Sequence, residues 1–191
     1  MTTELWRGSF GNDYHKRNMA AFASSKRERF WTKFYKAYPV RSVMEIGCGL
    51  GANLRWQRAE TIYGMDVNAD AVRVANTIPG VVVAEQSIFD RGFHSHAFEL
   101  VFTCGVLIHI ERSQLGEAIN EMVRISSKYI MAMEYESFQE QAIEYHGEAA
   151  ALWKRPYRAL ISHQLDEPIA GGYLTARQGF DRVTWSLWRK P

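Results

Sequence analysis

The chain has 191 residues, of which 47% are hydrophobic, and its formal net charge is +2. This length suits a single domain, residues 1–191, with a core of its own. The basic residues are scattered, which argues against a nucleic-acid partner, and no apolar run approaches the roughly 20 residues of a membrane span. The N-terminus lacks the pattern of a signal peptide, and the two cysteines, Cys48 and Cys104, suit a reducing compartment. We therefore expect a cytoplasmic protein with no membrane partner.

Residues 1–23, called the arm below, are rich in aromatic residues and glycine and predict a partly irregular segment. A helix is expected next, capped by Ser24 or Ser25 and ended by Pro39, because the residue before a proline leaves the helical region. The aromatic residues of this helix share one face: Phe30, Trp31, Phe34, Tyr35 and Tyr38. That face predicts packing against a sheet.

The apolar run at 42–46 is followed by glycines at 47, 49 and 51, and the next apolar run ends in Asp66. A strand, a glycine turn and a helix, with a carboxylate at the tip of the second strand, form the arrangement by which an α/β sheet holds an adenosine. Glycines let the backbone approach the ligand, and the acid accepts the ribose hydroxyls. We therefore expect Gly47, Gly49, Gly51 and Asp66 to bind a nucleoside. The alternative is that Asp66 only caps the helix beginning at Asn68.

Strand and helix patterns alternate along the rest of the chain. Strands are expected at 42–46, 62–66, 81–85, 99–104 and 129–135, and helices near 51–59 and 68–77. Ser113 is expected to cap a further helix, whose apolar stripe contains Leu115, Ile119, Met122 and Val123. Residues 172–178 and 182–189 predict a terminal antiparallel hairpin. This order predicts an α/β, Rossmann-like fold with a mostly parallel seven-stranded sheet, a C-terminal antiparallel hairpin and helices on both faces.

The glycine turn alone fits either a dinucleotide or S-adenosylmethionine. Glu45, two residues before the first glycine, favours S-adenosylmethionine, because a carboxylate there can organise the cationic methionyl end and would repel a pyrophosphate. Some forty residues precede the first strand, and a chain of this length leaves little room for a separate substrate domain. We predict S-adenosylmethionine as cofactor and S-adenosylhomocysteine as product, with a nicotinamide enzyme as the outside alternative.

Several polar residues follow the later strands, where a substrate would lie. His109 is a candidate general base, although it can equally fix a backbone carbonyl in a turn. The excursion at 136–165, together with Glu134 and Tyr135 before it, is the candidate substrate side, against the alternative of a solvated amphipathic helix. Its chemistry-bearing residues include Tyr145, His146, Lys154 and Arg155. No metal is predicted, since His94 and His96 lie in a polar loop without a third ligand.

With these residues in place, the chain resembles the class I S-adenosylmethionine-dependent methyltransferases. More narrowly, Trp6–Tyr14, Val101–Ile110 and the Tyr145–Arg155 stretch resemble the methylases associated with pseudaminic acid biosynthesis. The resemblance implies that His109, Glu134 and Tyr135 serve the reaction, and that the first 39 residues fold over the cofactor as a lid. It also implies small-molecule chemistry by a monomer or homodimer.

The same resemblance implies particular cofactor contacts. Tyr14 and Arg17 would face the methionyl carboxylate, and Cys104 would lie beside the methionyl group. Ser87 and Ile88 would hold the adenine. Asn53 and Val67 would also contact the cofactor. Three alternatives stay open: self-reaction of the cofactor to methylthioadenosine, a non-catalytic cofactor-binding subunit, and methylation of a nucleic-acid base.

Overall fold

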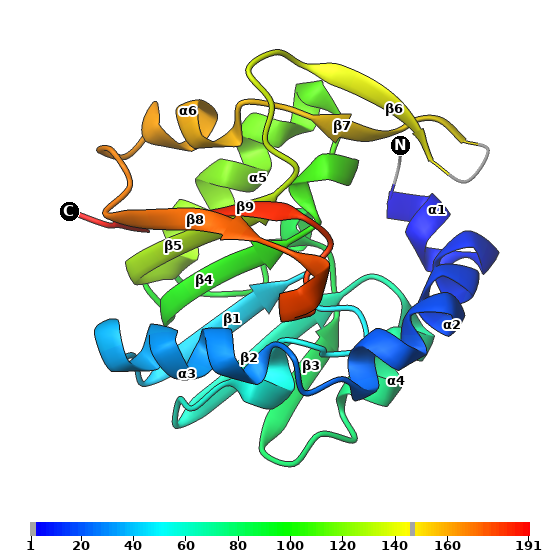
Figure 1. Cartoon of the computed structure of the whole chain (residues 1–191), viewed down its shortest axis with the longest axis horizontal. Coiled ribbons are helices and arrows are strands. Elements are labelled where there is room, and N and C mark those ends of the chain that lie inside the picture. The colour runs from blue at the N-terminus through cyan, green and yellow to red at the C-terminus, as the bar shows by residue number, and fades with distance from the viewer. Residues whose placement is uncertain (1–2, 146–147) are drawn as a thin grey trace.

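The central sheet of the computed structural model, which describes residues 3–145 and 148–191, has the strand order β3-β2-β1-β4-β5-β9-β8 (Figure 1). The strands from β1 to β5 pair in parallel, and β9 runs antiparallel to both β5 and β8. The bounds are β1 (Ser42–Ile46), β2 (Thr61–Asp66), β3 (Val81–Glu85), β4 (Phe98–Cys104), β5 (Ser126–Glu134), β8 (Ala170–Leu174) and β9 (Val183–Arg189). The predicted fold and its C-terminal hairpin are confirmed.

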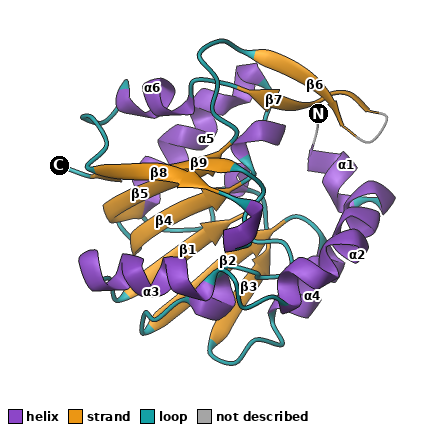
Figure 2. Ribbon diagram, in the orientation of Figure 1, coloured by secondary structure: helices purple, strands orange, loops and turns teal. Residues whose placement is uncertain are grey.

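Helices cover both faces of this sheet (Figure 2). The α-helices are α1 (Thr3–Arg7), α2 (Ser9–Ala23), α3 (Glu28–Ala37), α4 (Ala69–Ala75), α5 (Arg112–Ile125) and α6 (Tyr157–Ser162). Short 3-10 helices are η1 (Leu54–Trp56), η2 (Ile88–Asp90), η3 (Leu107–His109) and η4 (Ala176–Gln178). None of the helices in the described ranges is long and apolar enough to cross a membrane.

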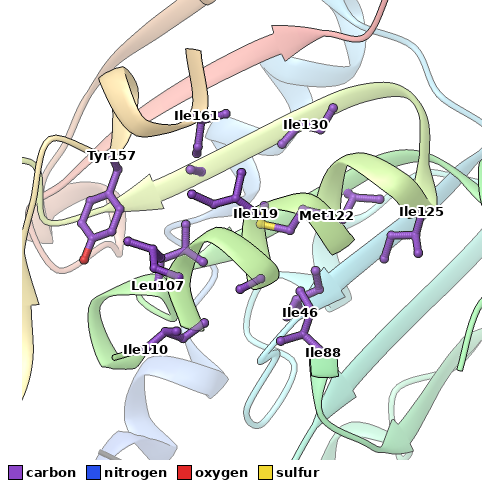
Figure 3. Close-up of a cluster of buried hydrophobic side chains, with 14 of the residues drawn as sticks. Ile46, Ile88, Leu107, Ile110, Ile119, Met122, Ile125, Ile130, Tyr157 and Ile161 are labelled. Carbon is purple, nitrogen blue, oxygen red and sulfur yellow. The ribbon is translucent and has the colours of Figure 1, made fainter. Parts of the chain in front are cut away.

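Alternation along the buried strands divides the core between the two faces. Met44 and Val101 point to a cluster that contains the apolar stripe of α5 and also Tyr157 of α6 (Figure 3). Val43 and Phe102 point to the opposite cluster, where the aromatic face of α3 packs as predicted. The two clusters hold the sheet rigid from both sides, so the loops after its strands are firmly positioned.

The arm is helical, so the prediction of an irregular segment was wrong. Trp6, Phe10 and Tyr14 recur every four residues, which is a helical period, and their rings pack edge to face with centroids 5.3 Å apart. Gly11 obscured the pattern. It is needed because a Cβ there would lie 2.0 Å from the Trp6 carbonyl oxygen, where α1 and α2 meet.

Other helix boundaries also differ from the sequence prediction. The helix after the arm begins at Glu28 and not at the expected serines. Ser113 lies inside α5, since Glu111 occupies the N-cap position. The helix expected near 51–59 is only the short η1, because the chain there turns tightly to pack under the sheet edge.

The excursion after β5 is not an amphipathic helix. It contains an antiparallel pair of strands, β6 (Gln141–Tyr145) and β7 (Glu148–Lys154), followed by α6. This pair lies on the same side of the molecule as α1 (Figure 1). The arm and the excursion, far apart in sequence, therefore approach each other at one end of the sheet.

Candidate functional site

A cavity of about 220 Å³ lies between the carboxyl ends of β1 to β4 and the helices of the arm. The strand side is made by the loops after those four strands, as expected for a ligand site in an open α/β sheet. The arm side is made by Thr3, Trp6, Tyr14, His15, Asn18 and Phe22. Of the residues predicted to bind or act, the following line this cavity: Tyr14, Glu45, Gly47, Gly49, Asn53, Asp66, Val67, Ser87, Ile88, Cys104 and His109.

The glycine turn has left-handed backbone at each predicted glycine, with φ of 63° at Gly47, 52° at Gly49 and 81° at Gly51. At Gly47 an added Cβ would lie 2.5 Å from the Val106 side chain, so this glycine lets two loops meet. At Gly49 it would lie 3.3 Å from the His15 ring, across the cavity. Gly51 packs against α4 and does not line the cavity.

Gly49→Val is expected to abolish binding of S-adenosylhomocysteine, with a loss of at least 100-fold, while the protein stays folded. The valine side chain would enter the cavity, and a β-branched residue resists positive φ. Calorimetric titration measures the affinity. Gly80→Val is the matched control, because Gly80 also has positive φ but has open space around it. Normal binding by Gly49→Val would mean that the loop is an ordinary turn.

Asp66 presents a buried carboxylate to the cavity. Its Oδ2 accepts the Gly49 backbone N–H at 2.7 Å, and its Oδ1 accepts the Asn68 N–H at 2.9 Å. Each oxygen keeps a lone pair for a hydroxyl group of a ligand. Asn68, and not Asp66, caps α4, because its side chain accepts the Ala71 N–H at 3.0 Å. Burial raises the pKa of Asp66, although the backbone donors and His15 oppose that shift.

Glu45 is the other carboxylate of the cavity, and only one of its oxygens has a hydrogen-bond partner. Oε1 accepts the Asn53 amide at 2.6 Å, whereas Oε2 is buried without a partner in the described part of the chain. Arg27 donates to the Asn53 oxygen at 2.9 Å and so orients that amide. Burial raises the pKa of Glu45 to about 8. An unsatisfied buried acceptor facing a cavity suits a cationic donor from a ligand.

The predicted adenine loop adopts a defined turn. Ser87 caps η2 by accepting the Phe89 N–H at 3.3 Å, and Asp90 accepts the Ser87 N–H at 2.7 Å. Ile88 covers the cavity floor and also belongs to the core. Cys104 lines the cavity, and burial raises the pKa of its thiol to about 11, so it is uncharged and a poor nucleophile.

The arm is fixed to the strand ends by hydrogen bonds. The Asn68 amide nitrogen donates to the Trp6 carbonyl at 3.0 Å and to the Asn12 side chain at 2.7 Å. Arg55 donates to the Phe22 carbonyl and lies over the Phe22 ring. The Trp6 indole N–H is buried without a partner in the described residues, so a ligand can accept from it.

The turn after β4 is held by two buried charged side chains. Glu134 is 1% exposed and accepts the backbone N–H groups of Val106 at 3.1 Å and Ile108 at 3.4 Å. Arg155 is fully buried and donates to the Ile110 carbonyl at 2.7 Å. Burial raises the pKa of Glu134 to about 7, although these donors lower it. The pair clamps the turn that carries His109.

Several predicted residues therefore lie away from the cavity. Glu134 and Arg155 support the turn from behind, and Arg17 is exposed on α2. Neither Tyr145 nor Lys154 lines the cavity, although Tyr145 packs 5.6 Å from the His109 ring. The remaining predicted residues outside the lining are Gly51 and Tyr135. His146 lies outside the described residues.

Three of the lining residues that the sequence analysis missed come from one helical face. His15, Asn18 and Phe22 line the cavity at spacings of three and four residues, a signal that a helical interpretation of the arm would have revealed. Arg27 was also missed, because its place beside Glu45 depends on long-range packing. Among the described residues, no three His, Cys, Asp or Glu side chains gather as a metal site would require.

Residues 43–128 match a family model described as a methyltransferase domain. A sequence search of curated proteins found no significant match. Among solved structures, the 1,6-didemethyltoxoflavin-N1-methyltransferase of Burkholderia thailandensis, with bound 1,6-didemethyltoxoflavin and S-adenosylhomocysteine, superposes with a TM-score of 0.75. It is 12% identical, and the alignment covers 98% of this chain and 88% of that one.

Magnesium protoporphyrin IX methyltransferase from Synechocystis PCC 6803, with bound S-adenosylmethionine, has a TM-score of 0.70 at 12% identity, covering 99% of this chain and 95% of that one. The cyclase SpnF has a TM-score of 0.65 at 14% identity, covering 88% and 86%. At these identities the structural likeness establishes the fold. The family model adds that residues 43–128 are similar to a methyltransferase domain, and these two methyltransferase neighbours carry S-adenosylhomocysteine and S-adenosylmethionine.

Proposed function

We propose that the protein transfers the methyl group of S-adenosylmethionine to a small polar metabolite, such as an amino sugar acid, an amino acid or a natural-product intermediate. The observation that carries the proposal is the unsatisfied Oε2 of Glu45, buried in the same cavity as Asp66 and the glycine turn. We also propose a cytoplasmic monomer or homodimer that acts on free small molecules and not on nucleic acid. The narrower resemblance to pseudaminic acid-associated methylases belongs to this proposal.

The residues present fit the cofactor. Glu45 offers an acceptor for the methionyl ammonium, and Asp66 offers lone pairs for the ribose. The loop at 86–89 provides an apolar floor and backbone groups for the adenine. Arg27, which donates to the Asn53 side chain and to the Gly179 carbonyl, supplies a cation for the methionyl carboxylate. When bound, S-adenosylmethionine supplies an activated methyl group.

The chain's own contribution is then mainly orientation. The arm forms one wall of the cavity, and the clamped turn after β4 fixes Val106 and His109 beside it. His109 lies where it can take a proton from an acceptor, which is needed only when that proton must leave early. Holding the reacting groups in line supplies much of the rate without an acid–base pair.

Two other functions use the same cavity. The fold likeness to SpnF, named as a [4+2]-cyclase, concerns the fold alone, and self-reaction of the cofactor is kept as the second candidate because it needs only the residues that bind S-adenosylmethionine. Mass analysis of the nucleoside product separates the candidates. Methyl transfer yields S-adenosylhomocysteine, self-reaction yields methylthioadenosine, and a binding subunit stabilised by the cofactor yields neither. The same assay is applied to His109→Ala. If His109 is the general base, this variant should lose turnover while its cofactor affinity stays unchanged.

Asp66→Ala is expected to weaken S-adenosylmethionine and S-adenosylhomocysteine binding alike, by about 1.5–3 kcal/mol, because two hydrogen bonds to a charged acceptor are lost. Calorimetry measures both affinities. Asp66→Asn removes the charge and keeps one acceptor, but its amide nitrogen then meets one of the two backbone donors, so a loss of similar size is expected. Asp70→Asn, an exposed carboxylate on the adjacent helix, is the control. A wild-type protein that binds a dinucleotide but not S-adenosylhomocysteine would refute the cofactor assignment.

A further inference from the structure

One polar side chain of the arm lines the cavity without supporting the fold through hydrogen bonds. His15, on α2, is 7% exposed and belongs to the cavity wall. Within the part of the chain that the structure describes, its ring nitrogens make no hydrogen bond. Buried polar groups are normally hydrogen-bonded, so an imidazole placed in this way suits a partner on a ligand.

The His15 ring lies against the glycine turn. A Cβ added at Gly49 would lie 3.3 Å from Cε1 and 3.6 Å from Nδ1 of His15, so this edge of the ring faces the glycine. The backbone N–H of Gly49 in turn donates to Oδ2 of Asp66 at 2.7 Å. Gly49 therefore adjoins both the imidazole and the carboxylate.

A second connection joins the same two groups. Asn12 lies one helical turn before His15, and its side chain accepts the Asn68 amide at 2.7 Å. The Asn68 backbone N–H donates to Oδ1 of Asp66 at 2.9 Å. Residues three apart on a helix share a face, so this contact holds the His15 side of α2 toward the tip of β2. The Tyr14 ring packs edge to face on the imidazole, with centroids 5.4 Å apart, and limits its rotation.

The imidazole and the carboxylate have complementary hydrogen-bonding capacities. Burial lowers the pKa of His15, and the charges of Asp66 and Asp70 oppose that shift without reversing it, so the ring is largely uncharged at neutral pH. A neutral imidazole carries one N–H donor, whereas an ionised carboxylate only accepts. A hydroxyl group can donate its proton to the carboxylate and accept from the imidazole at the same time.

We propose that His15 is a specificity-determining residue of the cofactor site and donates a hydrogen bond to a ribose hydroxyl whose proton is accepted by Asp66. This inference rests on the proposed function, because it assigns a further ligand to the nucleoside of the cofactor. Asp66 alone would accept from any donor, whereas a second partner that requires an oxygen acceptor selects a hydroxyl. The ribose is then recognised by the sheet and by the arm together, and the site is incomplete without α2.

The test compares S-adenosylhomocysteine with its 2′-deoxy and 3′-deoxy analogues by calorimetry, in the wild type and in His15→Phe. This substitution keeps an aromatic ring beside Gly49 and Tyr14 but removes the N–H. The variant is expected to bind S-adenosylhomocysteine about tenfold more weakly. It should bind one of the deoxy analogues as tightly as the wild type does, because that analogue already lacks the hydroxyl that His15 contacts.

Two further variants complete the design. His15→Leu removes the ring and the N–H together and should give the same pattern of affinities, and thermal unfolding without ligand shows that each variant is folded. His163→Phe is the control, since His163 is an exposed histidine at the end of α6, and it should behave as the wild type.

An equal loss of affinity for all three compounds in the His15 variants would overturn the proposal, because a histidine that only packs the arm affects every ligand alike. Unchanged affinity of His15→Phe for S-adenosylhomocysteine would overturn it as well. A wild type that binds none of the three compounds refutes the cofactor assignment of the proposed function, and this outcome is distinct from both.

Discussion

Glu45→Gln is expected to bind S-adenosylhomocysteine about 10- to 100-fold more weakly than the wild type and yet to be the more stable protein without ligand. The binding loss follows because an amide cannot neutralise the methionyl ammonium, and hydrogen bonds to charged groups contribute about 1.5–3 kcal/mol. The stability gain follows because burial disfavours the ionised carboxylate and raises its pKa to about 8, whereas an amide is uncharged at every pH. Chemical denaturation at pH 8 should show a gain of about 1–3 kcal/mol.

The pH dependence of that gain has a definite sign. The pKa of Glu45 rises from 4.5 to about 8 on folding, so between these values the folded protein holds a proton that the unfolded chain releases. Its contribution to stability is therefore present below pH 4.5 and is lost as the pH rises to about 8. Glu45→Gln should lack this loss, whereas Glu85→Gln, an exposed carboxylate at the tip of β3, should retain it. A variant with the wild-type pH profile would show that Glu45 is not buried as described.

Glu134→Ala is expected to lower turnover by about 10- to 100-fold while cofactor affinity changes less than about threefold, since a small misplacement of reacting groups has effects of that size. Removing the carboxylate leaves the N–H groups of Val106 and Ile108 without their acceptor and releases the turn that carries His109. The free energy of unfolding should fall by about 2–4 kcal/mol. Steady-state kinetics, cofactor titration and denaturation provide the three measurements.

Glu134→Gln separates positioning from proton transfer. The amide oxygen can still accept from the turn, so a positioning role predicts near wild-type turnover and an unchanged midpoint in the pH–rate profile. A proton-transfer role predicts that the variant is as slow as Glu134→Ala and loses a limb near pH 7, the pKa of Glu134. Glu121→Gln is the control, because Glu121 is also a buried carboxylate but lies on α5, away from the turn. It shows how much of any change comes from lower stability alone.

The part of the candidate site that lines the cavity could be predicted from sequence because its signals are local. A strand, a turn and the next strand end bring Glu45, Gly49 and Asp66 together within about twenty residues, and the hydrogen bond between Asp66 and Gly49 closes that unit. Strand boundaries were also close to the prediction, since buried β-strands are continuous apolar runs.

The substrate half was less accessible because its contacts join distant segments. Arg155 reaches the Ile110 carbonyl across 45 residues, and the sequence alone made it a substrate ligand. Tyr135 meets Asp181 across 46 residues. Neither pairing has a periodic or motif signature. The strand β6 is polar and largely exposed, so no apolar run marks it in the sequence. The arm was mistaken for irregular structure because its glycine serves a close helix–helix approach.

Asn68 connects the arm to the Asp66 carboxylate. The side-chain nitrogen of Asn68 holds the arm through Trp6 and Asn12, and the backbone N–H of Asn68 donates to the Asp66 carboxylate, the proposed ribose ligand. We propose that a nucleoside bound between these elements departs only when the arm moves aside. The residence time of the spent cofactor, and with it the rate of repeated turnover, would then depend on how fast the arm opens.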